Sequence, residues 1–290
     1  TCEEFLDCIQ EFSKTDVGKF SKWYSQKGTI SVNVKRKYLK DKGLELTINQ
    51  KNKFCRLVVP IPIKISFFDQ EGNKVKFQFL NKYRHEHNLV LDNKEEKIIF
   101  PDIKDQVIPS LLRDFSAPVN LNTDLSLFEN ILLLKFDDNL FKKWDICQNL
   151  HLRFLKNNNL KLFTSSMKQI INNRSIDNSI ISLILTPPSY KTFQNSLSNY
   201  DPLELYALRN NYLIKFYKNL EDDLYHLFKN SLEKFYTNLD TKIRPLLRVL
   251  LEALCTIDNK FAKNITEEFY SSKIMEIKIL GLTACIKYNH

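Results

Sequence analysis

Glycine is scarce in this sequence, with five in 290 residues. Nucleotide-binding turns need glycine-rich loops that let the backbone approach a phosphate, so this scarcity excludes most nucleotide-binding proteins. The chain also lacks the H-E-x-x-H pattern of zinc hydrolases and the G-x-S-x-G pattern of serine hydrolases. The residues alone therefore predict a scaffold, with no catalytic residue, no substrate-binding residue and no metal ligand.

Long apolar runs and paired cysteines are missing as well. Runs such as 131–134 and 183–185 are too short to span a bilayer, and no signal-peptide pattern opens the chain. None of the six cysteines forms a C-x-x-C pair, and most lie in apolar runs. This pattern is typical of buried free thiols in a reducing compartment, so we expect a cytoplasmic protein with no membrane partner.

The net charge of +9 raises nucleic-acid binding as one hypothesis. Lysines are spread along the whole chain, however, and no Lys/Arg cluster alternates with stacking aromatic residues. Scattered lysines on solvated faces explain the charge more simply, so we expect no nucleic-acid partner. An apolar fraction of 43% supports a packed core. The Thr1 start and the apolar run 274–288 at the end look like cuts through a longer polypeptide.

The spacing of apolar residues changes twice along the chain. Residues 1–27 have helical spacing, Thr1 with Glu4 fits a capping box, and Gly28 fits a helix C-cap. Short segments with period two follow, separated by turn signals at 41–43 and 69–73, and these predict an antiparallel β-sandwich.

The last predicted strand covers 111–115, and helical spacing returns beyond Val119. Asp201-Pro202 is a predicted helix start, and Pro245 is expected in the first turn of another helix. Roughly eight helices predict an α-superhelix of stacked pairs, with no strict repeat. The predicted fold class is α+β multidomain: a helical tail at 1–27, a β-sandwich at 28–122 and an all-α superhelical array at 123–290.

Histidines supply the candidate metal ligands. His85-Glu86-His87 is the local histidine cluster, and an extended backbone would place both imidazoles on one face, as a metal site can use. The cluster lies in the polar stretch 81–88 without a third ligand nearby, so we interpret it as a solvated loop. His151 and His226 stand singly on predicted helices, where we expect surface or partly packed side chains.

Four segments carry a resemblance to a known family. Residues 20–29 (F-S-K-W-Y-S-Q-K-G-T) resemble the end of the catalytic domain of bacterial-type aminopeptidase N, and residues 109–119 (P-S-L-L-R-D-F-S-A-P-V) resemble the end of its β-sandwich. Residues 138–148 (D-N-L-F-K-K-W-D-I-C-Q) resemble the start of its helical domain. The fourth segment is 185–189 (L-T-P-P-S), followed by D-P and an arginine at 201, 202 and 209. The departures at Ile30, Lys143, Ile146 and Cys147 do not bear on the family.

The resemblance implies the C-terminal portion of a zinc metallo-aminopeptidase, a metalloprotease of peptide catabolism that removes N-terminal amino acids from peptides. In that family two histidines of H-E-x-x-H and a downstream glutamate hold one zinc, and the motif glutamate acts as general base. All of these residues precede the segment that matches Thr1. The resemblance therefore implies zinc in the parent enzyme and none in this chain, which we expect to be inactive alone.

The family also implies partners and a role. An upstream catalytic domain would pack on the helical tail and the sandwich, while residues 123–290 would cap the active site and restrict access for peptide substrates. The alternative is a stand-alone protein-interaction scaffold without catalysis. The apolar residues Phe5, Phe12, Phe20 and Trp23 argue against that alternative, because two lone helices cannot bury so many large side chains.

Overall fold

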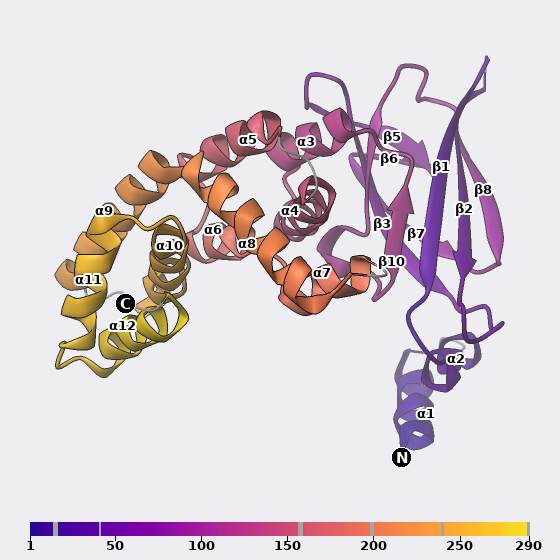
Figure 1. Ribbon diagram of the computed structural model, residues 1–290. Coiled ribbons are helices and arrows are strands. Elements are labelled where there is room, and N and C mark those ends of the chain that lie inside the picture. Colours follow the sequence, from indigo (N-terminus) through magenta and orange to yellow (C-terminus); the bar gives the residue numbers. More distant parts are fainter. Residues whose placement is uncertain (14–16, 41, 156–158, 198–199, 239–240, 289–290) are drawn as a thin grey trace. The chain divides into compact units, whose positions relative to one another are not determined.

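The computed structural model describes residues 1–13, 17–40, 42–155, 159–197, 200–238 and 241–288. The chain divides into two compact units, 1–142 and 143–290, which are coloured along the sequence in Figure 1. The first unit holds a helical tail, a β-sandwich and the helix α3 (Leu127–Phe136), and the second has helices and no strand among its described residues. The α+β fold class predicted from the sequence is confirmed.

The tail consists of α1 (Cys2–Ser13) and α2 (Gly18–Ser25). The backbone N–H of Glu4 donates to Thr1 Oγ1 at 3.2 Å, which is the predicted N-terminal cap. Gly28 has the left-handed backbone expected of it, with φ 78°, and a Cβ there would collide with the Phe54 ring. The expectation that Gly28 caps the helix is wrong, because α2 ends at Ser25 and the backbone of Gln26 is already extended.

The sandwich contains two four-stranded sheets and a hairpin. The first sheet has the strand order β10-β1-β2-β8. In the second sheet β3 is central: it pairs with β4 and β7 along one edge and with β9 along the other. The hairpin consists of β5 and β6. All pairs are antiparallel except β1 with β10. The strands are β1 (Ser31–Leu39), β2 (Gly43–Lys51), β3 (Ile61–Phe68), β4 (Lys74–Val75), β5 (Phe77–Phe79), β6 (Lys82–Arg84), β7 (Glu86–Leu91), β8 (Glu95–Phe100), β9 (Ile108–Leu111) and β10 (Asn120–Thr123).

Period-two alternation explains the sandwich core. Ile61, Ile63 and Ile65 of β3 point to one face and are fully buried, because successive side chains of a strand alternate between faces. The rings of Phe77 and Phe100 approach the Phe67 ring edge-on, with centroids 4.7 and 5.1 Å away. Each such pair contributes about 0.5–1.5 kcal/mol beyond its burial.

Two sequence expectations for this domain are wrong. The stretch 81–88 is not a solvated loop, since it forms β6 and the start of β7, in which His87 and Leu89 are buried. The strand expected at 111–115 ends at Leu111, because Leu112, Asp114 and Phe115 have φ of 55°, 54° and 54°. These left-handed residues turn the chain sharply out of the sheet.

The strand β10 at Asn120–Thr123 has no counterpart in the sequence analysis, which expected helical spacing beyond Val119. It pairs in parallel with β1, so that Val32 lies opposite Leu121. Its polar residues are half or fully exposed, and the apolar alternation that marks a strand is correspondingly weak.

Helices occupy the rest of the described chain. They are α3 (Leu127–Phe136), α4 (Leu140–Phe154), α5 (Lys161–Ile171), α6 (Asn178–Leu185), α7 (Tyr190–Ser196), α8 (Pro202–Lys218), α9 (Glu221–Asn238), α10 (Arg244–Thr256), α11 (Lys260–Tyr270) and α12 (Met275–Tyr288). These ten α-helices exceed the roughly eight expected. The predicted start of α8 is confirmed, with Asp201 as N-cap and Pro202 at the first position, and Pro245 lies in the first turn of α10.

The core of the helical unit centres on α10, which packs against α6, α8, α9, α11 and α12. Eight of its residues are buried, Leu246, Leu247, Val249, Leu250, Leu251, Ala253, Leu254 and Cys255. All six cysteines are free, and Cys147 and Cys255 are buried as predicted, whereas Cys2 and Cys8 are exposed. No described helix combines the length and apolar character needed to cross a bilayer.

Candidate docking surface

A shallow groove forms where the helical tail meets the sandwich. Its volume is about 310 Å³, and its wall is mostly apolar. The lining residues come from α2, from β3 and from the segment after Phe115: Phe20, Trp23, Tyr24, Pro62, Ser116, Ala117 and Pro118. The structure thus brings together two segments that the sequence analysis singled out separately, 20–29 and 109–119.

Trp23 anchors α2 to the sandwich. Its indole Nε1 donates to the carbonyl of Pro60 at 2.9 Å, and its ring packs against the sandwich core. The packing role predicted for this residue is confirmed. Phe20, about one helical turn before Trp23, and Tyr24, the residue directly after it, remain 46% and 51% exposed, with ring centroids 6.3 Å apart. Helix α2 therefore uses one large aromatic residue for its own attachment and presents two others to the groove.

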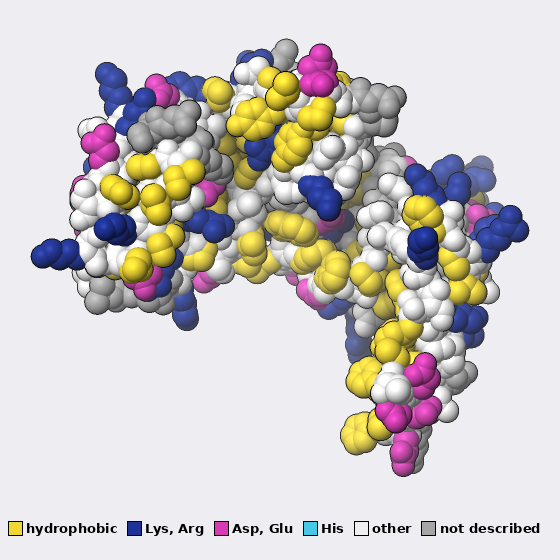
Figure 2. Space-filling model, turned by 60° about the horizontal axis from the view of Figure 1, so that its bottom comes forward, with side chains coloured by type: hydrophobic (Ala, Val, Ile, Leu, Met, Phe, Trp, Pro, Cys, Tyr) yellow, Lys and Arg dark blue, Asp and Glu magenta, His cyan; other side chains and the backbone are white. Residues whose placement is uncertain are grey.

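The exposed apolar surface continues along the tail. Phe5 and Phe12 of α1 are 56% and 92% exposed, and Phe54, which covers Gly28, is 68% exposed. Figure 2 shows hydrophobic side chains along one side of the tail at the lower right, next to its acidic tip. Contiguous exposed apolar surface of this kind marks an interaction site. We call the set Phe5, Phe12, Phe20, Tyr24 and Phe54, with the groove, the tail surface.

A buried charge cluster is centred on Arg113, in the left-handed turn at 112–115 that directly precedes the groove residues Ser116, Ala117 and Pro118. Arg113 is 2% exposed, and its Nε donates to Glu86 Oε2 at 2.6 Å. One terminal nitrogen donates to Asp137 Oδ1 at 2.6 Å, and the other donates to Asp138. The Asp137 side chain is fully buried. Arginine suits such a site because its planar fork of donors serves several carboxylates at once.

Two lysines extend this cluster toward solvent. Lys64 contacts Glu86 at 2.9 Å and Asp114 at 2.5 Å, and Lys74 contacts Asp138 at 2.9 Å. Burial raises the pKa of Asp138, but hydrogen bonds from Lys74 and Arg113 lower it more, to about 2. Each of the four acids Glu86, Asp114, Asp137 and Asp138 contacts a lysine or an arginine. The cluster therefore stabilises the turn at 112–115, and all four carboxylates are already paired.

The residues of the cluster His85-Glu86-His87 form contacts that stabilise the sandwich. His87 is buried in β7, with Nε2 3.1 Å from the Phe77 carbonyl, while Glu86 belongs to the charge cluster and the His85 carbonyl accepts from Ser66. The His85 side chain is exposed whereas that of His87 is buried, so the two imidazoles lie in different environments. Across the described residues, no group of three or more His, Cys, Asp or Glu side chains is placed to hold a metal ion.

The single histidines differ from each other. His226 is exposed, as expected. His151 is fully buried, which corrects the expectation of a surface or partly packed residue. Its Nδ1 lies 2.8 Å from the Tyr212 hydroxyl, and the Phe163 and Phe216 rings pack against it. Burial, followed by the nearby positive charge of Arg209, lowers the pKa of His151 to about 3, so this ring is neutral at neutral pH.

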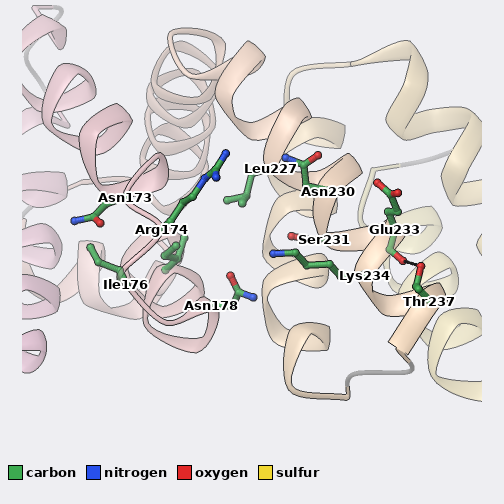
Figure 3. A pocket seen from close by; sticks show the side chains of 11 residues that line it. Asn173, Arg174, Ile176, Asn178, Leu227, Asn230, Ser231, Glu233, Lys234 and Thr237 are labelled. Carbon is green, nitrogen blue, oxygen red and sulfur yellow. Dashed lines mark hydrogen bonds between the residues drawn. The ribbon is translucent and has the colours of Figure 1, made fainter.

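A hollow of about 590 Å³ in the helical unit lies between the α5–α6 turn and α9. Figure 3 shows Arg174 on the turn and Lys234 on α9, with their charged ends directed into the gap. Arg174, Glu233 and Lys234 are all exposed. The charged part of the lining is therefore solvated, unlike the mostly apolar lining that is typical of a small-molecule site.

Comparison with known proteins gives a consistent result. Residues 28–124 match a domain of unknown function with an Ig-like fold (DUF3458), and residues 128–290 match its C-terminal companion, described as ARM repeats (DUF3458_C). Aminopeptidase N of Haemophilus influenzae is 29% identical over 245 residues, which are 77% of this chain and 28% of that protein. Aminopeptidase N of Escherichia coli K12 is 28% identical over 243 residues, with the same coverage.

A solved structure shares the fold. The crystal structure of Legionella pneumophila aminopeptidase A in complex with aspartic acid matches with a TM-score of 0.83 and 23% sequence identity. The match covers 100% of this chain and 35% of the Legionella chain. This chain therefore spans roughly a third or less of the relatives it matches. The predicted resemblance to the C-terminal portion of aminopeptidase N is confirmed, and the chain belongs to the family defined by the paired DUF3458 Ig-like and ARM-repeat domains.

Proposed function

We propose that this chain is the non-catalytic C-terminal part of a cytoplasmic zinc aminopeptidase that removes N-terminal amino acids from peptides. Residues 1–27 are the last helices of the catalytic domain, 28–122 form the sandwich domain and 123–290 form the helical domain. The zinc and the catalytic residues belong to the parent enzyme. The helical domain caps its active site and restricts access to short or unfolded peptides.

The tail surface is the single observation that carries this proposal. Its aromatic side chains are mounted on α1 and α2 and on the segment next to them, and burying one such side chain stabilises a contact by about 1.5–3 kcal/mol. An upstream catalytic domain packed on the tail and the sandwich would cover these groups. All groove residues except Pro62 lie in two segments that resemble aminopeptidase N, which supports an occupant from that same enzyme.

A stand-alone interaction scaffold is the second candidate. The exposed tail surface supports this alternative too, since another protein could cover it. The two functions differ in what precedes Thr1 in the gene. The scaffold predicts unrelated sequence there, whereas the peptidase predicts the catalytic motif.

The deciding experiment is to read the coding sequence upstream of Thr1. We expect an in-frame H-E-x-x-H motif followed by a downstream glutamate, because one zinc needs these three ligands. A start codon directly before Thr1, or an upstream domain without this motif, would contradict the peptidase and favour the scaffold.

A further inference from the structure

The hollow between the α5–α6 turn and α9 contains a buried hydroxyl group without a partner. Ser231 of α9 lines this hollow and is 3% exposed. Among the described residues, no side chain or backbone group forms a hydrogen bond with its hydroxyl. Figure 3 shows the Ser231 oxygen on the side of α9 that faces the turn. The hydroxyl is therefore directed into the hollow.

Other hydroxyl side chains of the helical unit show what is unusual about Ser231. A serine or threonine inside a helix commonly donates to the carbonyl of the residue four positions earlier. Thr237 of the same helix donates to the Glu233 carbonyl at 2.8 Å, and Ser166 of α5 donates to the Leu162 carbonyl at 2.9 Å. A buried hydroxyl without a partner costs free energy. The orientation of Ser231 therefore indicates that the hollow itself supplies the partner.

Two cations lie beside this hydroxyl. Arg174 on the turn and Lys234 on α9 direct their charged ends into the hollow, and within the described part of the chain neither forms an ion pair. The lining also includes the acidic residue Glu233, whose carboxylate points away from the turn in Figure 3. The hollow therefore combines uncompensated positive charge with a neutral donor.

The rest of the lining is polar and aliphatic. It comprises three carboxamides, one hydroxyl and three aliphatic side chains: Asn173, Asn178, Asn230, Thr237, Ile176, Ile181 and Leu227. Each carboxamide can both donate and accept, so this lining suits a ligand that carries several hydroxyl groups. The volume of about 590 Å³ falls within the range of about 300–1,000 Å³ that is typical of small-ligand sites.

We propose that this hollow binds a small phosphate monoester with a polar, hydroxyl-rich body. A phosphate monoester carries a charge of about −1.5 to −2 at neutral pH and has three acceptor oxygens. Arg174, Lys234 and Ser231 supply donors for these oxygens, and the two cations balance the dianion. A carboxylate has one charge and two oxygens, and it would leave one of the cations unbalanced. This site goes beyond the proposed function, because it needs neither the zinc nor the upstream domain.

The test uses the full 290-residue chain and three probes that share one sugar ring, glucose 6-phosphate, glucuronate and glucose. We expect glucose 6-phosphate to bind in calorimetry at millimolar concentrations or below, glucuronate to bind at least about tenfold more weakly and glucose to show no measurable binding. Glucuronate affinity equal to that of the phosphate ester, or no binding of the ester, would overturn the proposal. Inorganic phosphate that binds as tightly as glucose 6-phosphate would overturn the assignment of an ester.

The serine variant tests whether the hydroxyl contacts the ligand. In Ser231→Ala we expect about a tenfold loss of glucose 6-phosphate affinity, since a hydrogen bond to a charged group is lost. Its free energy of unfolding should not fall, because no hydrogen bond within the protein is removed. Ser166→Ala is the matched control, a buried serine with a bonded hydroxyl, and should bind as the wild type does. Wild-type affinity in Ser231→Ala would mean that water alone satisfies the hydroxyl, and the proposal would be wrong.

A lysine pair on α9 tests the role of the charge. Lys234→Gln should lower the affinity for glucose 6-phosphate about tenfold or more, because it removes one of the two cations of the hollow. Lys229→Gln makes the same change at an exposed residue of α9 outside the lining and should leave the affinity unchanged. Equal losses in the two variants would show nonspecific attraction to the basic surface and would refute the site.

Discussion

At the scale of single residues, Arg113 shows what a motif can hide. The sequence marked it only as part of a segment that resembles a family pattern. In the structure it is the buried centre of a cluster whose acids lie 27, 24 and 25 residues away in sequence, at Glu86, Asp137 and Asp138. A single sequence without an alignment contains no signal that pairs positions so far apart, so only the fold could reveal this cluster.

Replacing Arg113 tests its structural role. Arg113→Leu leaves the fully buried Asp137 without its cation, and breaking a buried pair in this way costs about 3–5 kcal/mol. We expect the free energy of unfolding in urea to fall by that amount. Arg84→Leu is the matched control, because Arg84 is exposed on β6 and should change stability by no more than about 0.5 kcal/mol. Equal losses in both variants would show that the cluster contributes nothing specific.

At the scale of elements, the sequence predicted those with strong apolar periodicity and missed those without it. The strands β1, β2 and β3 alternate regularly and were predicted, whereas β10 is polar and pairs only through its backbone register with β1. The error at 81–88 has a related cause. His87 counts as polar in a pattern, yet it is buried because its ring packs on Phe77 at 4.7 Å and its Nε2 meets a backbone carbonyl.

The candidate surface was partly predictable for the same reason. Helical spacing placed Phe5, Phe12 and Phe20 on the tail, and their number indicated a missing partner. The groove itself was not predictable, because it needs Pro62 and Pro118 beside α2, and their proximity depends on the tertiary fold.

The tail gives a prediction at this scale. The double variant Phe5→Ser, Phe12→Ser changes two exposed side chains, so we expect the free energy of unfolding to stay within about 0.5 kcal/mol of the wild type. Binding to the separately produced polypeptide encoded upstream of Thr1, measured by calorimetry, should weaken at least about 10-fold, because two apolar anchors are lost.

Leu203→Ser is the control for that experiment. Leu203 is 79% exposed on α8, outside the tail surface, and its replacement should leave the binding unchanged. Wild-type affinity of the double tail variant would mean that the tail surface is not where the upstream polypeptide docks.

At the scale of the whole molecule, the order of parts carries more functional information than any local site. An Ig-like sandwich is followed here by a helical array, as in the family that the chain belongs to, and a helical tail precedes both. The described acidic groups of the charge cluster are paired with cations, and the buried His151 is neutral and bound to Tyr212. Paired and buried groups of this kind stabilise the fold. Zinc-dependent peptide hydrolysis needs metal ligands and a general base in addition.

The isolated chain should therefore bind no stoichiometric zinc and release no amino acid from a chromogenic alanine substrate. One zinc at a catalytic site needs three protein ligands and an activated water, and the described residues contain no such group of side chains. Metal analysis after dialysis and an activity assay with and without added zinc measure both properties, and the complete enzyme of a relative serves as the positive control. Zinc-dependent turnover that persists through purification and is abolished by a chelator would place catalytic residues within 1–290, and the assignment of this chain as a non-catalytic part would then be wrong.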